Sequence, residues 1–361
     1  MIIDKSKKSV LVGMSGGVDS STVAAILKKD GYNVVGVTLQ LYKQEEVVGK
    51  SKACCGSKDT YDAKKVSTDI GISHYVINYE SEFKRDVVDN FVESYKNGIT
   101  PIPCVRCNQS VKFRDMVKVA KDLGIDYVAT GHYVRRIDGE NGVEMHAALD
   151  KSKDQSYFLF ATTRQQLEMA LFPLGGYEKS QTRQLARDLG VSISEKRESQ
   201  DICFIPDGDH VGFLKKIDPN FEKPGDIIRL ETGKIVGKHS GAMFYTRGQR
   251  RGIGVGGSGV PLYVISTDIA NNLVYIGGED LLFESSLTIG DVNFISQAHE
   301  NLQEFECNVV LRALQNEIPA IVTKSGDFYK ISLKTPGRAI TKGQACVMYD
   351  GTMVIGGGWI I

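Results

Sequence analysis

The sequence predicts an α/β protein, with an N-terminal parallel sheet covered by helices, a small central β-rich domain and a C-terminal β-barrel. Over about the first 200 residues, short apolar runs alternate with segments of helical periodicity, which is the rhythm of βαβ units. A glycine-rich loop joins the first apolar run to the first helix. After about residue 215, turn-forming residues separate short strand-like runs, which is typical of β-rich domains.

The chain has 361 residues, which is too long for one compact core. We therefore expect three domains, over residues 1–215, 216–283 and 284–361. The first apolar runs predict strands at 10–13, 34–39, 74–77 and 127–130. Helical spacing predicts helices at 20–29, 62–70 and 110–123. Near the C-terminus, alternation over 329–333 predicts a strand of the barrel.

Composition and charge exclude several classes of protein. Lys plus Arg and Asp plus Glu number 44 each, so the net charge of zero argues against a non-specific polyanion binder. No apolar run of ~18 residues predicts a membrane span, and the N-terminus carries no export leader, so we expect a cytoplasmic protein. Seven unevenly spaced cysteines do not form a disulfide framework; they favour reduced, catalytic or metal-binding thiols.

The glycine-rich loop between the first strand and the first helix predicts a phosphate site. Gly16 and Gly17 allow backbone N–H groups to approach an anion, and the helix that follows directs its positive end to the same place. No Gly-Lys-Ser/Thr follows, so this is not a Walker loop. Asp19 favours a bound pyrophosphate group with Mg²⁺ rather than γ-phosphate transfer. A glycine turn with capping serines is the alternative.

Two cysteines lie just before the predicted 110–123 helix. With Asn108 as its N-cap, Cys107 would adjoin the positive end of the helix, where the dipole and Arg106 would favour a thiolate. Two alternatives stay open. One is a zinc site in which Cys104 and Cys107 join Cys54 and Cys55, and the other is a set of buried thiols.

Cys203 follows polar residues and precedes a short apolar run, so we expect it in a loop at a strand edge. A cysteine in such a context is more often a small buried hydrophobe than a reactive group. The histidines show no metal-ligand spacing, and the sequence assigns no residue to a metal.

Five segments, spread over most of the chain, resemble the bacterial tRNA-specific 2-thiouridylases, a family of AMP-forming pyrophosphatase-loop (PP-loop) enzymes. They are Gly13-Met14-Ser15-Gly16-Gly17-Val18-Asp19-Ser20, Thr100-Pro101-Ile102-Pro103-Cys104-Val105-Arg106-Cys107-Asn108, Ala129-Thr130-Gly131-His132-Tyr133, Lys153-Asp154-Gln155-Ser156-Tyr157-Phe158 and Ser199-Gln200-Asp201-Ile202-Cys203-Phe204-Ile205. The resemblance implies an adenine nucleotide alpha-hydrolase-like, Rossmann-like first domain. It also implies ATP-dependent conversion of the wobble uridine of tRNA for Lys, Glu and Gln to 2-thiouridine.

The resemblance also implies roles for individual residues. Cys107 takes the nucleophile position and Cys203 the persulfide-carrying position, and the two would form a disulfide. The residues implied to bind ATP are Gly13, Met14, Ser15, Gly16, Gly17, Val18, Asp19, Ser20, Leu39 and Gly131. Those implied to bind tRNA are Ile102, Pro103, Cys104, His132, Lys153, Asp154, Gln155, Arg312, Ala313 and Gln344.

The implied partners are the anticodon stem-loop of tRNA and a persulfide donor, either a cysteine desulfurase or a sulfur-relay protein. The implied cofactors are ATP and Mg²⁺, and a zinc or iron–sulfur cluster is not excluded. The family often has Asn-Pro-Asp where this chain has Ile102-Pro103-Cys104, so a polar contact to the target base is lost or replaced. Ala313 stands where an aromatic or ring residue is common, so a stacking contact is missing.

Two other functions remain open at this point. Another AMP-forming PP-loop ligase or synthetase would explain the glycine-rich loop but not the two cysteines. A non-catalytic, metal-binding RNA-binding protein would use Cys54, Cys55, Cys104 and Cys107 as ligands.

Overall fold

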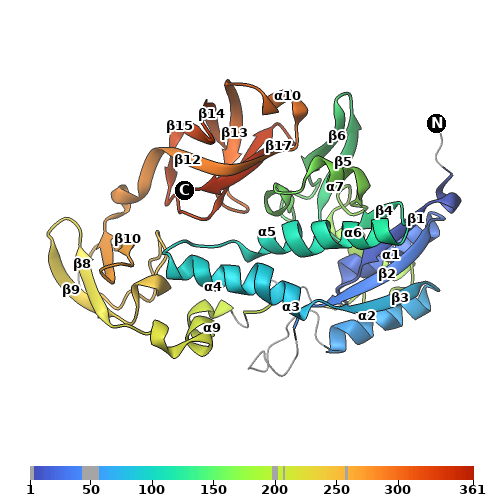
Figure 1. The fold of residues 1–361 in the computed structure, drawn as a ribbon, viewed down its shortest axis with the longest axis horizontal. Helices are drawn as coiled ribbons and strands as arrows, with labels where there is room; N and C mark the ends of the chain where they lie inside the picture. Colours follow the sequence, from blue (N-terminus) through green and yellow to red (C-terminus); the bar gives the residue numbers. More distant parts are fainter. Residues whose placement is uncertain (1–3, 43–56, 197–201, 206–207, 257–258) are drawn as a thin grey trace.

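The computed structural model describes residues 4–42, 57–196, 202–205, 208–256 and 259–361 (Figure 1). It contains three sheets, which correspond to the three predicted parts of the chain. Among the described residues, no helix is long and apolar enough to cross a membrane.

The first sheet is parallel and has the strand order β3-β2-β1-β4-β7. Its strands are β1 (Ser9–Gly13), β2 (Asn33–Gln40), β3 (Ser73–Asn78), β4 (Tyr127–Ala129) and the short edge strand β7 (Ala170–Leu171). The four strands predicted for this region are confirmed to within one residue at every end. Strands β2 and β3 lie on one side of β1, and the later strands β4 and β7 lie on the other. The strand order therefore reverses at β1. Such a reversal is a topological switch point, and α/β folds bind ligands there at the carboxyl ends of the strands.

Helices cover both faces of this sheet. Apolar residues of α1 (Val18–Lys29), α2 (Ser57–Asp69) and α8 (Lys179–Asp188) pack with Val10 and Val12 of β1 on one face. On the other face, Met116, Val117 and Ala120 of α6 (Met116–Asp122) pack with Leu11. The helical spacing of 110–123 also indicated Phe113 and Leu123 on its apolar face; Phe113 is buried, whereas Leu123 is exposed.

Two long helices run antiparallel through the middle of the molecule (Figure 1). One joins α3 (Glu80–Phe83), a π-helical stretch η2 (Lys84–Val88) and α4 (Asp89–Lys96). The other joins α5 (Pro103–Cys107), a π-helical stretch η3 (Asn108–Asp115) and α6. π-Helical turns occur frequently at functional sites. The remaining α-helices described are α7 (Arg164–Met169), α9 (His210–Ile217) and α10 (Gln297–Glu300).

The central sheet has the order β10-β11-β8-β9. It consists of β8 (Gly225–Arg229), β9 (Lys234–His239), β10 (Tyr263–Asp268) and β11 (Leu273–Gly277), around a small apolar core. The predicted central β-rich domain is confirmed.

The C-terminal strands form a closed barrel, as predicted. Its order is β12-β15-β14-β13-β16-β17, and β12 pairs back with β17. The strands are β12 (Phe283–Phe294), β13 (Glu304–Val310), β14 (Ile318–Ser325), β15 (Phe328–Arg338), β16 (Ala345–Asp350) and β17 (Met353–Ile360). Side chains of β15 alternate between exposed and buried over 328–333, as the sequence indicated.

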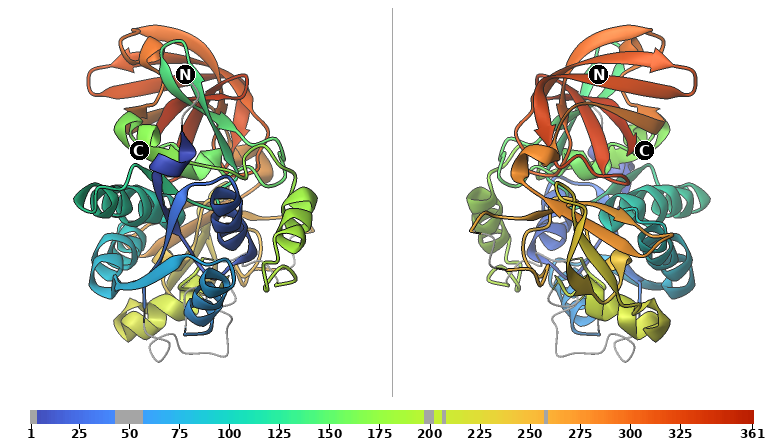
Figure 2. Two further views of the ribbon diagram at one scale, coloured as in Figure 1. Left: turned by 90° about the vertical axis from the view of Figure 1, so that its right-hand side faces the viewer. Right: turned by 90° about the vertical axis from the view of Figure 1, so that its left-hand side faces the viewer.

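One feature of the first region was not predicted. The antiparallel hairpin of β5 (Val134–Gly139) and β6 (Gly142–Ala147) extends the barrel sheet, because Met353 of β17 pairs with His146 of β6. The barrel therefore lies against the first domain (Figure 2).

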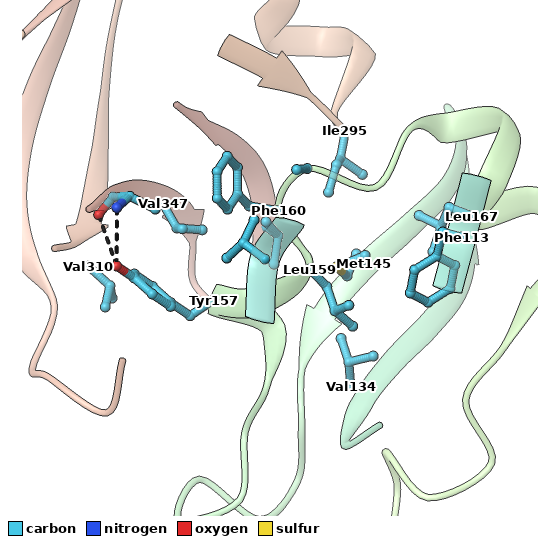
Figure 3. Packing of buried hydrophobic residues seen from close by; sticks show 14 of the residues in the cluster. Phe113, Val134, Met145, Tyr157, Leu159, Phe160, Leu167, Ile295, Val310 and Val347 are labelled. Atoms are coloured by element: carbon cyan, nitrogen blue, oxygen red, sulfur yellow. Dashed lines mark hydrogen bonds between the residues drawn. The ribbon is translucent and has the colours of Figure 1, made fainter. Parts of the chain in front are cut away.

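An apolar cluster fills the contact between the barrel and the first domain (Figure 3). Phe160 and Leu159 contribute from the first domain, and Val310 and Val347 from the barrel. The hydroxyl of Tyr157 donates to the carbonyl of Ala345 at 3.2 Å and accepts from its N–H at 3.3 Å. This shared core fixes the barrel relative to the helix that carries Cys107, because Ile102 and Val105 belong to the same cluster.

Candidate functional site

The predicted phosphate loop lies between β1 and the start of α1. α1 begins at Val18, two residues earlier than the sequence indicated, with Gly17 as its N-cap residue in an extended conformation. Gly16 has a φ of +71°, and a Cβ there would collide with the backbone of Asp59, so only glycine fits. The Ser20 hydroxyl accepts a hydrogen bond from Ser15 N at 3.1 Å. The loop thus closes onto the N-terminus of α1, the end that favours anions.

Asp19, in the first turn of α1, is held by two side chains. The ammonium group of Lys179 lies 2.7 and 2.8 Å from its carboxylate oxygens, and the hydroxyl of Tyr133 donates to Oδ1 at 3.0 Å. Sequence reasoning did not assign Lys179 or Tyr133 a role at this loop. Lys179 is the first residue of α8, far along the chain, and nothing in its local sequence indicates this contact.

A second lysine also anchors the loop. Lys196 donates to the Gly16 carbonyl at 2.9 Å and forms ion pairs with Asp59 and Asp62 of α2, at 2.5 and 2.6 Å. These contacts tie the loop to α2. No local sequence pattern indicates these contacts, because the three segments lie far apart along the chain.

The structure brings Gly131 to the phosphate loop and places Leu39 near the end of β2. A Cβ at Gly131 would lie 2.9 Å from the backbone nitrogen of Ser20, so a glycine there permits a close approach of the two segments. Leu39 is half-buried and packs against two apolar clusters. Met14 N donates to the carbonyl of Val37 at 2.7 Å, which joins the loop to β2.

The predicted start of the Cys107 helix is wrong. The helix begins at Pro103, with Ile102 as its N-cap residue, and continues without interruption to Asp122. Proline is favoured at the first helical position because its missing N–H has no intrahelical acceptor. Asn108 therefore lies inside the helix and does not cap it; its amide donates to the Phe158 carbonyl at 3.0 Å.

The expected environment of Cys107 is also corrected. Cys107 is buried, and this burial raises the pKa of its thiol, while the ammonium group of Lys112 opposes the shift. The Arg106 guanidinium stacks over the Trp359 ring at 4.7 Å, so it is engaged with the barrel. The cation that acts on the Cys107 thiol is therefore Lys112, one turn further along the helix, rather than Arg106.

Cys203 lies in a turn between α8 and α9, not at the edge of a strand. The buried side chains of Phe204 and Ile205 anchor the turn, and the ring of Phe204 contacts that of Phe91 edge-on at 5.4 Å. Cys203 itself is half-buried, and the Tyr42 hydroxyl donates to its carbonyl at 3.1 Å. Segment 199–201, which completes its motif, lies outside the described residues.

Cys107 and Cys203 belong to one apolar cluster, although they lie far apart in the sequence. Cys107 is one of its buried members, and Cys203 packs against it from the turn. The same cluster includes Leu39 and Leu41 at the end of β2, on the side of the phosphate loop. The structure therefore places both cysteines in one apolar cluster, which also reaches the end of β2.

Lys112 connects the cysteine helix to the loop after β4. Its ammonium nitrogen lies 3.5 Å from Nε2 of His132, whose Nδ1 is 2.8 Å from the Thr130 hydroxyl. Burial lowers the pKa of His132 well below its usual range, with Lys112 as a second cause, so His132 is neutral at pH 7. Sequence reasoning assigned Lys112 no role at the site.

The barrel side of the site gathers several residues predicted to contact tRNA. Gln344 donates to the carbonyl of Thr100 at 3.0 Å, next to the segment that holds Ile102, Pro103 and Cys104. Ile102 and Pro103 are buried, whereas Cys104 is exposed. Arg312 is exposed on the barrel, and Ala313 packs against the shared apolar cluster.

Three further residues predicted to bind tRNA, Lys153, Asp154 and Gln155, lie in the loop before η4 (Ser156–Leu159). This loop contacts Tyr133, whose hydroxyl reaches Asp19. Gln155 accepts a hydrogen bond from Tyr133 N at 3.0 Å, and Asp154 accepts from Ala148 N at 2.7 Å and the Ser156 hydroxyl at 2.6 Å. These polar atoms bond within the chain and position the 153–156 loop. Lys153 in this loop is half-buried. Contact of these residues with tRNA stays a prediction.

The alternative zinc site stays a prediction as well. Cys54 and Cys55 lie outside the described residues. Within the ranges that the structure covers, no group of three or more His, Cys, Asp or Glu side chains is arranged to hold a metal ion.

Three family models match the chain in succession. They are described as the tRNA methyl transferase HUP domain, over residues 8–207, the tRNA methyl transferase PRC-barrel domain, over 212–278, and the aminomethyltransferase beta-barrel domain, over 284–360. The first model covers more than half of the chain.

Curated relatives match over almost the full length. Proteins named tRNA-specific 2-thiouridylase MnmA are 50% identical in Rickettsia rickettsii, over 98% of this chain and 97% of that protein, and 49% identical in Orientia tsutsugamushi, over 99% and 97%. The protein of that name in Rickettsia bellii is 50% identical, over 100% and 98%.

A solved structure of a 4-thiouridine synthetase–RNA complex with bound ATP is a weaker match. It is 16% identical and covers 59% of this chain and 51% of that chain, with a TM-score of 0.38. That likeness is too low to transfer a function.

Proposed function

The chain belongs to the family of tRNA-specific 2-thiouridylases, and we propose that it is an ATP-dependent enzyme that replaces the C2 oxygen of a tRNA uridine by sulfur. The observation that supports the proposal is that Cys107 and Cys203, far apart in the sequence, belong to one apolar cluster that includes Leu39 and Leu41 at the end of β2. By the family resemblance, the target is the wobble uridine in tRNA for Lys, Glu and Gln. The cytoplasm, where tRNA is modified and used, is its proposed location.

The C2 oxygen of uracil is a poor leaving group, so it is first activated. The oxygen attacks the α-phosphorus of ATP, which forms an O–P bond and releases pyrophosphate. The glycine-rich loop and the N-terminus of α1 would bind the phosphates. The target base has to be splayed out of the anticodon loop before its C2 atom can reach this site.

Mg²⁺ would accompany ATP. Mg²⁺ sites in proteins commonly use one or two carboxylates together with substrate phosphates, and Asp19 is a carboxylate at the phosphate loop. The Asp19 carboxylate and the hydroxyls of Ser15 and Ser20 are oxygen donors of the kind that this ion takes, although Lys179 holds both carboxylate oxygens in this structure. When bound, the ion would offset the negative charge of the phosphates.

Sulfur would come from a persulfide on Cys203, loaded by a cysteine desulfurase or a sulfur-relay protein. The terminal sulfur attacks C2, and AMP departs with the former uracil oxygen. Cys107 then attacks the Cys203 sulfur, which breaks the S–S bond to the transferred atom and forms a Cys107–Cys203 disulfide. In a second order of events, Cys107 attacks first and the released sulfide displaces AMP. The atoms balance in both cases.

Mass spectrometry of tRNA nucleosides tests the proposal directly. After incubation of the protein with tRNA, ATP and a cysteine desulfurase with cysteine, 2-thiouridine should appear at one position. One AMP and one pyrophosphate should form for each sulfur transferred. Pyrophosphate release that depends on an amine or amino acid instead of tRNA would favour a PP-loop ligase and contradict the proposal.

We predict that Cys203→Ser abolishes thiolation and leaves the Kd for tRNA within about twofold of wild type, because the substitution removes only the sulfur carrier. Gel-shift titration and nucleoside analysis measure the two effects. Cys307→Ser on β13 is the matched control, since Cys307 lies on the barrel. Weak tRNA binding by the Cys203 variant would contradict a purely chemical role.

A further inference from the structure

Cys104 and Cys107 lie three residues apart in the first turn of the long Pro103–Asp122 helix. With a rise of about 1.5 Å per residue and a radius of about 2.3 Å, this spacing places the two Cα atoms about 5 Å apart. Disulfides usually join Cα atoms roughly 4.4 to 6.8 Å apart. The helix therefore holds the two cysteines at a separation that a disulfide can span.

The two thiols occupy different environments. Cys107 is buried in the cluster that it shares with Cys203, whereas Cys104 is exposed. The charge of a Cys104 thiolate raises the pKa of Cys107, which places the two sulfurs within electrostatic reach of each other. The ammonium group of Lys112 acts on both and favours both thiolates. The protein packed around Cys104 raises the pKa of the Cys104 thiol by desolvation. The Cys104 residue is nevertheless exposed to solvent.

We propose that Cys104 is a resolving thiol, which attacks Cys107 after each thiolation and moves the disulfide from Cys107–Cys203, whose partner cysteine is half-buried, to Cys104–Cys107, whose partner cysteine is exposed. This inference rests on the proposed function, which generates the Cys107–Cys203 disulfide. The Cys104 thiolate forms a bond to the Cys107 sulfur, the Cys107–Cys203 bond breaks, and Cys203 leaves as a thiolate that takes up a proton. One disulfide is exchanged for another, so no net oxidation or reduction occurs.

The physical advantage lies in access. A reductant would have to reach the Cys107–Cys203 bond inside an apolar cluster, and thiol–disulfide exchange requires that the attacking sulfur reach its target. After the transfer, one end of the disulfide lies at the surface. An external dithiol then reduces the Cys104–Cys107 disulfide by two electrons and is itself oxidised to a disulfide. Cys203 is already a free thiol at this stage and can accept the next sulfur atom from the donor.

Stopped-flow or quenched-flow thiolation, with dithiothreitol as the dithiol, tests this inference. For each protein, the steady-state rate is divided by the rate of the first turnover of a pre-loaded Cys203 persulfide. Any effect of residue 104 on tRNA contact enters both rates and cancels in this ratio. We expect Cys104→Ser to lower the ratio at least tenfold, and Cys307→Ser to leave it at the wild-type value.

Peptide mapping under non-reducing conditions, after one turnover without dithiothreitol, identifies the disulfide. Wild type should yield Cys104–Cys107, and Cys104→Ser should yield Cys107–Cys203. The inference would be overturned by two results together. Wild type would thiolate tRNA but retain only the Cys107–Cys203 disulfide, and Cys104→Ser would show the wild-type ratio of steady-state to first-turnover rate. Stoichiometric zinc on Cys104 and Cys107 in the active protein would overturn it too. Absence of any thiolation by wild type would instead refute the proposed function.

A second measurement does not depend on turnover. The Cys107–Cys203 disulfide can be formed with a mild oxidant at low pH, where exchange is slow because few thiols are ionised. After a jump to pH 8, we expect Cys104–Cys107 to replace it in wild type and no change in Cys104→Ser. Persistence of Cys107–Cys203 in wild type at pH 8 would contradict the inference whether or not the enzyme thiolates tRNA.

Discussion

At the start of α1, the negative charge of Asp19 lies where the phosphates of ATP would bind. Lys179 compensates this charge, and the salt bridge is partly buried, with 12% of the lysine side chain and 29% of the aspartate side chain exposed. Ion pairs of this kind are less screened by solvent than surface pairs. In the proposed ATP site, Lys179 would therefore allow the Asp19 carboxylate and the phosphates to lie close together.

We predict that Lys179→Met weakens ATP binding at least tenfold, which corresponds to about 1.4 kcal/mol, because the uncompensated Asp19 carboxylate would repel the phosphates. Isothermal titration calorimetry measures the Kd. Lys179→Arg keeps the charge and should lose less affinity. Lys5→Met is the control: it breaks an exposed salt bridge with Asp30 at the other end of the same helix. Equal Kd values for wild type and Lys179→Met would refute this role.

At the scale of elements, β1 and β4 are joined at their starts by a single carboxylate. Asp126 accepts hydrogen bonds from the N–H and hydroxyl of Ser9, both at 2.9 Å, and from Lys8 at 2.7 Å. These bonds, led by that from Lys8, lower the pKa of Asp126 to about 2. The contact fixes the parallel register in which Val10 pairs with Tyr127.

We predict that Asp126→Asn lowers the melting temperature by a few degrees at pH 7, because neutral asparagine loses the charge-assisted bonds. The folded-state pKa lies below the ordinary value of 3.8, so the stabilisation is complete above pH 3.8 and is lost as the pH falls through about 2. Circular dichroism melts between pH 7 and pH 2 measure the difference. A difference between variant and wild type that did not shrink toward pH 2 would contradict this assignment.

At the scale of the whole molecule, the barrel and the first domain share one core. Phe160 is fully buried and contacts the Trp359 ring edge-on at 5.5 Å, and Trp359 in turn lies under Arg106. The pairing of β6 with β17 adds a backbone connection between the two domains. The barrel therefore supports the start of the helix that holds Cys104 and Cys107.

We predict that Phe160→Ala lowers the free energy of unfolding by about 3–5 kcal/mol, the usual cost of removing a buried phenylalanine ring. Because the lost contacts join two domains, we also expect unfolding to separate into two transitions. Urea titration followed by tryptophan fluorescence and by circular dichroism measures both effects. Phe328→Ala, at a half-exposed position of the barrel, is the control and should cost less than about 1 kcal/mol. One unchanged transition in Phe160→Ala would contradict the shared core.

Local patterns in the sequence were sufficient to predict most strands and helices of the first domain and the glycine-rich loop. The apolar runs, the helical stripe of Met116, Val117 and Ala120, and the position of Gly16 are all set by neighbouring residues. Local patterns also led to one wrong prediction. Asn108 has the side chain of a typical helix N-cap, but the helix begins five residues earlier, at Pro103.

Which charged side chains pair, and which thiols share a cluster, could be learned only from the folded chain. Lys179 reaches Asp19, Lys196 reaches Asp59 and Asp62, and Cys203 joins Cys107, all across long stretches of chain. Periodicity and capping act over a few residues and carry no information about such pairs. Their meeting depends on the strand order of the sheet and on the packing of separate helices, which are fixed only when the whole core assembles.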